Sequence, residues 1–332
     1  MDISGKRILV IGGAGLIGSH VVEELLKEDV QEVIVYDNFC RGTLENLEKA
    51  LKDPRCHVFE IGGDILQTDV LDAAMRGVDA VVHLSALWLL QCYEFPRAAF
   101  DVNIRGTFNV LEACVLSNVK RLVYSSSASV YGDAVGEPMS EDHPYNNWTF
   151  YGATKIAGEH MLKAYHKRYG LKGVGLRYMN VYGPRQDYKG TYTAVIMKIL
   201  DRIDKGFSPV VYGDGSQAYD FIYVGDAARA NVCALKSTIP FGCYNVGRGI
   251  KTSIKELTEL ILKITNSDLS IQYEPAGQTF VTNRVGDATA AERDLAFRWS
   301  IDLKEGLPRL IEWRKSHTKE MEGGLKKAEV KD

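Results

Sequence analysis

The chain of 332 residues lacks the long uninterrupted apolar runs that a membrane-spanning helix needs. Its first residues, Met1 to Lys6, are polar and do not resemble the apolar stretch of a secretory signal peptide. An excess of one charge is also missing, because 40 Lys and Arg residues face 43 Asp and Glu residues, for a net charge of -3. Without a basic excess the protein has little attraction for a phosphate backbone. We therefore expect a cytoplasmic protein that binds neither membranes nor nucleic acids.

Cysteine is sparse, and its spacing excludes the common metal sites. The six cysteines form no C-x-x-C pair and have no histidine nearby at metal-ligand spacing. The seven histidines are scattered, and a lone one such as His83, at the end of an apolar run, is more often a hydrogen-bonded core residue than a ligand. We expect reduced thiols and no bound metal.

The chain does contain a regular alternation of short apolar runs and helical stretches. The expected strands are residues 7–11, 32–36, 56–61, 78–83, 121–125 and 173–178. Apolar residues at helical spacing predict one long helix over residues 96–118 and another over residues 150–169. Strands that alternate with helices predict an α/β fold with a doubly wound parallel sheet of the Rossmann type, here with six strands.

Glycines spaced three apart follow the first apolar run, in Gly12-Gly13-Ala14-Gly15-Leu16-Ile17-Gly18. Glycine lets the backbone turn tightly and approach a pyrophosphate, which would then face the N-terminus of the following helix. Asp37 ends the second run, about twenty residues later, where an acid accepts hydrogen bonds from the ribose hydroxyls of adenosine. Because Asp37 would repel the 2′-phosphate of NADP, we predict NAD. The nearby Arg41 keeps NADP open as an alternative.

The composition becomes richer in turn residues after Gly183-Pro184, which predicts a smaller C-terminal α/β lobe for the substrate. Residues 220–235 again have the pattern of a strand and a helix, and we expect them to return to the first sheet. The predicted NAD-binding domain is therefore residues 1–183 plus about 218–240. The predicted substrate lobe is residues 184–217 and 241–315. The charged residues 316–332 are expected to form a flexible tail.

Tyr151 is the one tyrosine of the seventeen with a lysine four residues later, Lys155, and both fall on the second long helix. The two side chains then share one helix face. An ammonium beside a phenol stabilises the phenolate, and the positive charge of NAD⁺ acts in the same direction. We therefore predict a lowered pKa for Tyr151, which would make it a general base, with Lys155 as its partner. Ser127 closes the fifth strand, where parallel sheets bind ligands, and is the predicted partner of the reacting hydroxyl.

Further motifs occur along the chain in a fixed order. They are Tyr36-Asp37-Asn38, Gly63-Asp64-Ile65, His83-Leu84-Ser85-Ala86, Asn103-Ile104-Arg105-Gly106-Thr107, Ser125-Ser126-Ser127-Ala128-Ser129-Val130-Tyr131-Gly132, Tyr151-Gly152-Ala153-Thr154-Lys155 and Arg177-Tyr178-Met179-Asn180-Val181-Tyr182-Gly183-Pro184. Together with the glycine-rich turn they resemble the extended short-chain dehydrogenase/reductase family. Within it they are most similar to the NAD-dependent nucleotide-sugar epimerases typified by UDP-glucose 4-epimerase.

The resemblance implies which residues contact the cofactor. Asp64 and Ile65 would contact the adenine, and Lys155 would also bind the nicotinamide ribose. The full implied set is Gly12, Gly15, Leu16, Ile17, Gly18, Asp37, Asn38, Arg41, Gly42, Asp64, Ile65, Leu84, Ser85, Ala86, Asn103, Ser125, Tyr151, Lys155 and Tyr178.

The resemblance also implies the substrate contacts. Ser127 would hold the sugar O4 beside Tyr151, Asn180 would hydrogen-bond the nucleotide-sugar, and the segment with Val211 and Tyr212 would cradle the base. Trp88 follows the loop after the fourth strand and is either loop packing or a wall of the substrate pocket.

Two positions depart from the family pattern. Tyr219 stands where relatives carry an arginine on the substrate diphosphate, and a phenol can donate only one hydrogen bond. Arg284 either lies at the wall of the hexose pocket or, if a deletion follows Asp287, is itself the diphosphate arginine. The sequence leaves both alternatives open.

The residues after Ser127 indicate the reaction. Dehydratases and decarboxylases of this family carry an acid in the next two positions, which here are Ala128 and Ser129. Without a carboxylate the simplest remaining chemistry is reversible oxidation and reduction at one carbon. We therefore predict an isomerase, a nucleotide-sugar 4-epimerase.

Three further expectations complete this interpretation. The alternative functions are a 4-keto reductase or dehydrogenase with the same residues, and a non-catalytic nucleotide-sensing protein. Asn180 favours a neutral sugar, because glucuronate epimerases carry threonine at that site. The resemblance also implies a homodimer that pairs the two long helices.

Overall fold

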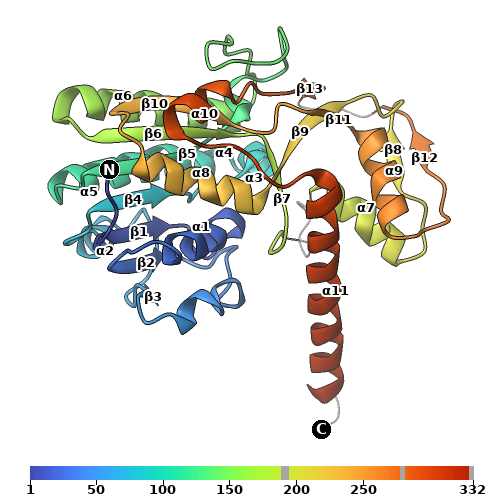
Figure 1. The fold of residues 1–332 in the computed structure, drawn as a ribbon, viewed down its shortest axis with the longest axis horizontal. Coiled ribbons are helices and arrows are strands. Elements are labelled where there is room, and N and C mark those ends of the chain that lie inside the picture. Colours follow the sequence, from blue (N-terminus) through green and yellow to red (C-terminus); the bar gives the residue numbers. More distant parts are fainter. Residues whose placement is uncertain (188–193, 277–280, 329–332) are drawn as a thin grey trace.

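A parallel sheet of seven strands forms the centre of the larger part of the molecule (Figure 1). The computed structural model describes residues 1–187, 194–276 and 281–328. The order across the sheet is β10-β6-β5-β4-β1-β2-β3, and every neighbouring pair is parallel. The strands are β1 (Arg7–Ile11), β2 (Glu32–Tyr36), β3 (Cys56–Val58), β4 (Ala80–His83), β5 (Arg121–Ser127), β6 (Lys172–Tyr178) and β10 (Phe241–Val246).

The central strands are apolar along their whole length because helices cover both faces of the sheet. Side chains alternate between the faces along each strand. In β1, Ile8 and Val10 therefore join one core cluster, while Leu9 and Ile11 join the cluster on the other face. All four side chains are fully buried.

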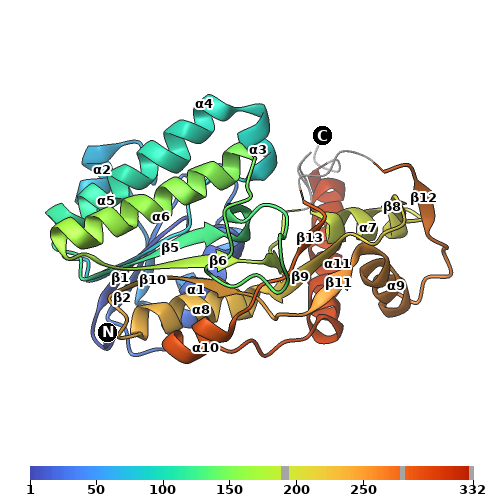
Figure 2. The same cartoon turned by 90° about the horizontal axis from the view of Figure 1, so that it is seen from above.

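Figure 2 shows the helices in two layers, one on each side of the sheet. One layer holds α1 (Leu16–Leu26), α8 (Val224–Lys236) and α10 (Thr289–Leu295). The other holds α2 (Thr68–Ala74), α4 (Pro96–Ala99), α5 (Thr107–Leu116) and α6 (Phe150–Tyr169), with α3 (Leu89–Glu94) at its end. The predicted Rossmann-type architecture is confirmed.

The sheet contains one strand more than the six predicted. β10 pairs in parallel with β6, from Phe241 beside Gly173 to Val246 beside Tyr178. It falls inside residues 241–315, which the sequence had assigned to the substrate lobe. An edge strand has one neighbour and tolerates glycine and polar residues, so its sequence lacks the apolar run of a central strand.

The segment expected to return to the first sheet does so only in part. Helix α8 packs beside α1 on the parallel sheet, in the same core cluster as Val21 and Val22. Strand β9 (Ala218–Tyr223) instead belongs to a second sheet, where it pairs with β7 (Asn180–Tyr182), β11 (Lys251–Ser253) and β13 (Asn283–Arg284). The boundary between the two lobes therefore passes between β9 and α8.

The smaller lobe is completed by a two-stranded sheet and three helices (Figure 1). The strands are β8 (Val210–Tyr212) and β12 (Gln272–Glu274), and the helices are α7 (Val195–Asp204), α9 (Ile254–Ile264) and α11 (Leu303–Ala328). Helices α7, α9 and α11 pack around Phe221 of β9 in a core cluster of their own.

The two long helices have different outcomes. Residues 150–169 form α6 as predicted, with the Thr149 hydroxyl accepting from the Gly152 N–H at 3.0 Å and Gly170 ending the helix at φ +73°. Residues 96–116 are helical throughout, but a π-helical segment, η3 (Phe100–Gly106), lies between α4 and α5. No helix in the described ranges is long and apolar enough to cross a membrane.

Residues 316–328, expected as a flexible tail, continue helix α11, which extends away from the rest of the molecule in Figure 1. Lysine and glutamate, which dominate this segment, are good helix formers despite their charge. Residues 329–332 of the expected tail lie outside the described residues.

Candidate active site

The glycine-rich turn between β1 and α1 packs too closely for side chains. Gly12 has φ +79°, and a Cβ on it would lie 2.9 Å from the backbone nitrogen of Ser85. A Cβ on Gly18 would lie 2.1 Å from the Gly12 carbonyl oxygen. Gly15 caps helix α1 without a side chain, so the first N–H groups of the helix face the turn with no side-chain cap. This geometry suits a pyrophosphate.

Asp37 lies directly beside this turn. Its carboxylate accepts from the backbone N–H groups of Ala14 and Phe39, both at 2.8 Å, while burial raises its pKa. A carboxylate has lone pairs for further donors, so these two bonds leave capacity for ribose hydroxyls. A Cβ on Gly63 would lie 2.2 Å from the Asp37 carbonyl carbon, which brings Asp64 next to Asp37.

The remaining predicted adenine-side residues surround the same turn. A Cβ on Gly42 would lie 2.6 Å from the Ala14 carbonyl carbon. Ile65 is buried against Gly106, where an added Cβ would lie 2.5 Å from its Cδ1 atom. The structure thus gathers the predicted adenosine-binding residues from the ends of β1, β2 and β3.

Asn103 holds the loop that follows β4. Its Oδ1 accepts from the Leu87 N–H at 2.7 Å, and its Nδ2 donates to the Leu87 carbonyl at 2.9 Å and to Thr154 Oγ1 at 3.1 Å. These bonds fix the loop with Leu84, Ser85 and Ala86 to helix α6. Asn103 was predicted as a cofactor contact, and in the structure its amide positions the cofactor loop.

Trp88, at the end of that loop, meets Arg41 from the loop after β2. The guanidinium carbon of Arg41 lies 5.2 Å from the centroid of the Trp88 ring, and Nη2 lies 3.2 Å from Asp187 Oδ2. Arg41, Trp88 and Asp187 are named the bridging cluster below. It connects a predicted cofactor residue with a predicted substrate residue, from segments that are far apart in sequence.

The three predicted catalytic side chains lie together where β5 ends and α6 begins. Tyr151 and Ser127 share a hydrogen bond. Lys155 Nζ lies 5.7 Å from the centroid of the Tyr151 ring and donates to the Ser125 carbonyl at 2.7 Å. Both Ser127 and Tyr151 are half-buried, whereas Lys155 is fully buried.

The predicted direction of the Tyr151 pKa is wrong for the protein alone. Burial raises the pKa of Tyr151 to about 12, while the hydrogen bond with Ser127 and the charge of Arg284 oppose that rise. Burial also lowers the pKa of Lys155 to about 8. Helical spacing places the ammonium near the phenol, but its hydrogen bond goes to the Ser125 carbonyl, and desolvation exceeds the electrostatic gain.

Two predicted cofactor residues face the protein core instead. The Ser125 hydroxyl donates to the Tyr178 oxygen at 3.3 Å, and the Tyr178 hydroxyl donates to Asn231 Oδ1 at 2.9 Å. Both side chains are buried between β5, β6 and α8. Ser125 acts on the site through its carbonyl, which holds Lys155.

A buried ion pair beneath the site was missed by the sequence analysis. Arg177 donates to Glu159 through Nε at 2.9 Å and through Nη2 at 2.7 Å, and the Ser126 hydroxyl donates to the same carboxylate at 2.5 Å. The pair connects β5, β6 and α6 one helical turn beyond Lys155. Glu159 follows Lys155 by four residues, which was the available signal, but its partner on β6 depends on the strand order.

On the substrate side, Arg284 of β13 lies directly opposite Tyr219 of β9. Its Nη1 is 3.4 Å from Ser129 Oγ and its Nη2 is 3.5 Å from the Gly132 carbonyl oxygen. The Tyr219 hydroxyl donates to the Val281 carbonyl at 2.7 Å, so its one proton is committed within the protein. This corrects the expectation that Tyr219 could donate to a phosphate.

The segment predicted to cradle the base presents one side chain. Val211 is fully buried, and its Cγ1 would lie 2.8 Å from a Cβ on Gly215, so it has no surface for a ligand. Tyr212 points to the other face of the strand and is 56% exposed. Asn180, at the start of β7, is half-buried.

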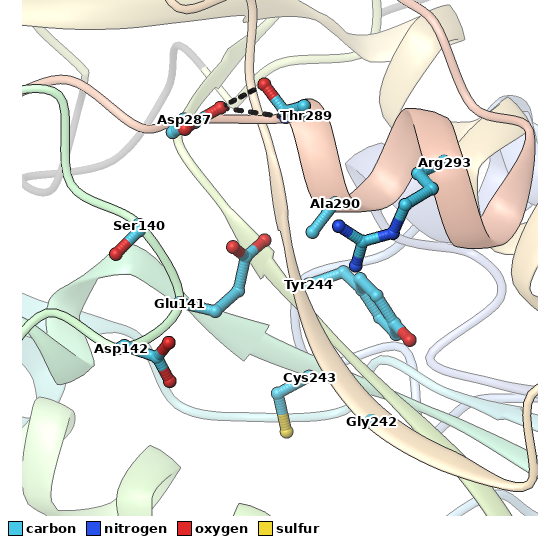
Figure 3. A pocket seen from close by; sticks show the side chains of 10 residues that line it. All are labelled: Ser140, Glu141, Asp142, Gly242, Cys243, Tyr244, Asp287, Thr289, Ala290 and Arg293. Carbon is cyan, nitrogen blue, oxygen red and sulfur yellow. Dashed lines mark hydrogen bonds between the residues drawn. The ribbon is translucent and has the colours of Figure 1, made fainter.

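A separate cavity of about 380 Å³ lies between the loop at residues 140–142, β10 and α10 (Figure 3). It is lined by Ser140, Glu141, Asp142, Gly242, Cys243, Tyr244, Asp287, Thr289, Ala290 and Arg293. None of the predicted site residues is among them. Across the described part of the chain, no group of three or more His, Cys, Asp or Glu side chains could hold a metal ion.

Known proteins resemble this chain over nearly its whole length. The UDP-N-acetylglucosamine 4-epimerase of Methanobrevibacter ruminantium, solved in complex with UDP-N-acetylmuramic acid, has a TM-score of 0.89 and 34% identity, over 95% of this chain and 99% of that one. The UDP-glucose 4-epimerase of Mycolicibacterium smegmatis is 32% identical over 92% of this chain and 98% of that protein.

A relative with another reaction is almost as similar. UDP-glucuronic acid decarboxylase 1 of Arabidopsis thaliana is 30% identical over 92% of this chain and 69% of its own length. Residues 8–247 match the model of the NAD dependent epimerase/dehydratase family, in agreement with NAD as the predicted cofactor. The chain therefore belongs to the NAD-dependent epimerase/dehydratase family, in which both epimerases and decarboxylases occur.

Proposed function

We propose that the protein is a nucleotide-sugar 4-epimerase that uses NAD and acts as an isomerase. The observation that carries the proposal is the grouping of Ser127, Tyr151 and Lys155 beside the glycine-rich turn, with Ala128 and Ser129 in place of an acid. A site without that acid lacks the group expected to remove a second proton from the sugar.

Each catalytic side chain has a role that follows from its position. Ser127 and Tyr151, already hydrogen-bonded to one another, are placed to receive a sugar hydroxyl between them. Tyr151 takes the proton of that hydroxyl, and Lys155 supplies positive charge beside it. Bound NAD supplies a hydride acceptor that returns the hydride to the opposite face of the same carbon. The raised pKa of Tyr151 indicates that the phenol is not a base before the cofactor charge is added.

A homodimer is part of the same proposal. The surface of η3 and the start of α6 exposes aromatic side chains, with Phe100 51% and Phe150 40% exposed. They line a cavity of about 430 Å³ together with Pro96, Arg97 and Asp101. Exposed apolar groups at the end of two long helices suit a second copy that pairs its helices with these.

The test is proton NMR of the purified protein without added NAD. We would incubate it separately with UDP-glucose, UDP-galactose, their N-acetyl forms and UDP-glucuronate. Appearance of a C4 epimer supports the proposal and shows that NAD is retained through purification. A product that forms only when NAD is added in stoichiometric amounts favours the dehydrogenase alternative, and loss of CO₂ from UDP-glucuronate favours a decarboxylase.

The matched control is Tyr151→Phe, which keeps the ring and removes the phenol proton carrier. We expect a loss of about 100-fold to 10,000-fold in kcat. Turnover that is unchanged in this variant would contradict the assignment of Tyr151 as the base.

A further inference from the structure

Arg284 carries a positive charge that the protein does not neutralise. The side chain is half-buried, its Nε is fully buried, and Nε has no hydrogen-bond partner in the described part of the chain. Its two other contacts are long, 3.4 Å to the Ser129 hydroxyl and 3.5 Å to the Gly132 carbonyl, and both acceptors are neutral. Burial lowers its pKa to about 10.

The nearest acidic residue does not act as the counter-charge. Asp133 accepts from the Thr282 backbone N–H and hydroxyl and from the Asn283 N–H, at 2.8 to 2.9 Å. These bonds hold the start of β13 in place and leave the guanidinium facing elsewhere. A desolvated arginine without a carboxylate is costly, whereas an arginine that receives an anion from its ligand forms a strong bidentate contact.

The position of Arg284 indicates which part of the substrate would bring that anion. Ser129, its neighbour, donates its backbone N–H to the Ser127 hydroxyl at 3.1 Å, and Ser127 is hydrogen-bonded to Tyr151. The charge of Arg284 also acts on the pKa of Tyr151. The guanidinium is therefore connected to the reacting end of the site through one serine.

Resting on the proposed epimerase function, we infer that Arg284 binds a carboxylate carried by the hexose itself, so that the preferred substrate is an anionic nucleotide-sugar. The carboxylate is on a ring carbon beside C4, either as a uronate or on an ether at O3, and it is kept through the reaction. This reverses the preference for a neutral sugar drawn from Asn180. It also assigns Arg284 to the sugar and not to the diphosphate.

The test is calorimetric binding, which needs no turnover. We would titrate UDP, UDP-glucose, UDP-glucuronate and UDP-N-acetylmuramate into the NAD-loaded protein and into Arg284→Gln. For the unaltered protein we expect at least one of the two acidic sugars to bind more tightly than UDP-glucose. For Arg284→Gln we expect about 10-fold to 100-fold weaker binding of that acidic sugar, with UDP and UDP-glucose changed less than about threefold.

Two further variants separate charge from shape. Arg284→Lys keeps the charge without the planar fork and should recover part of the preference. Ser129→Ala removes the hydroxyl contact and keeps the charge, so it should retain the preference.

Three outcomes would overturn the inference. Equal weakening of UDP and of all the sugars in Arg284→Gln would place the arginine on the diphosphate. Unchanged binding of every ligand in that variant would remove it from the site. An unaltered protein that binds UDP-glucose as tightly as both acidic sugars would refute the preference. Because UDP measures the nucleotide site alone, and binding is read without turnover, failure of the epimerase assay leaves this result interpretable.

Discussion

Lys155 is a buried ammonium whose environment favours its neutral form. Burial lowers its pKa to about 8 from the ordinary value of 10.5, and the Ser125 carbonyl is its hydrogen-bond acceptor. Below pH 8 the lysine is protonated in both the folded and the unfolded protein, so the cost of burying the charge is fully present. Between pH 8 and 10.5 the folded protein loses the proton first, and the cost disappears as the pH rises.

Replacing this lysine should therefore separate stability from activity. The pKa difference corresponds to about 3 kcal/mol at pH 7, less about 1 kcal/mol for the lost bond to Ser125. We expect Lys155→Met to raise the free energy of unfolding by about 1–2 kcal/mol at pH 7, with the gain shrinking towards pH 10, and to abolish turnover. Denaturant unfolding at both pH values measures this. A variant that is destabilised at pH 7 would contradict the prediction.

Arg41 offers a second prediction at the residue scale. It contacts both Trp88 and Asp187, so the bridging cluster connects the cofactor loops. Both members of the ion pair are more than one third exposed, so the contact is weak and its loss should leave the fold intact. We expect Arg41→Ala to release NAD about 3-fold to 10-fold faster in a cofactor-exchange assay. Lys52→Ala, from an ion pair on the surface, is the control, and equal release rates would exclude the role.

At the scale of elements, the catalytic strand and helix are joined by one buried ion pair. Glu159 of α6 accepts from Arg177 of β6 and from Ser126 of β5, next to Ser127. Both side chains of the pair are at most 5% exposed. Breaking such a pair leaves one buried charge uncompensated, which is more costly than removing both partners.

We expect Glu159→Gln to destabilise the protein by about 3–5 kcal/mol. The double variant Glu159→Leu with Arg177→Met should lose less than this single variant, because neither charge remains buried. Glu48→Gln, from a surface pair that is 74% exposed on both sides, should change stability by less than about 1 kcal/mol. Denaturant unfolding compares all three, and a double variant less stable than Glu159→Gln would contradict the argument.

At the scale of the whole molecule, the exposed aromatic residues on η3 and α6 are unusual for a surface. Phe100 and Phe150 line one cavity, and Phe108 nearby in sequence is 44% exposed. A charge placed among them would be desolvated in a paired interface and harmless in a monomer. We expect Phe100→Glu to convert the proposed dimer into a folded monomer.

Light scattering after gel filtration measures this directly, with circular dichroism to verify the fold. Phe207→Glu, at an exposed position outside these helices, is the control and should keep the dimer. A dimer that persists in Phe100→Glu would place the interface on another surface.

The sequence by itself determined the parallel sheet, the glycine-rich turn and the grouping of Ser127, Tyr151 and Lys155. These features depend on local patterns: apolar runs, fixed glycine spacing, and two residues one helical turn apart. Strands that run in parallel also bring their carboxyl ends to one edge, so residues after separate strands could be expected to meet.

Only the tertiary structure decided the features that depend on which distant segments become neighbours. Strand order placed β10 beside β6 and Arg177 against Glu159. The pairing of β13 with β9 set Arg284 opposite Tyr219 and close to Ser129. Desolvation set the direction of the Tyr151 pKa against the expectation from the nearby lysine. Burial and pairing are properties of the packed chain, and no local pattern contains them.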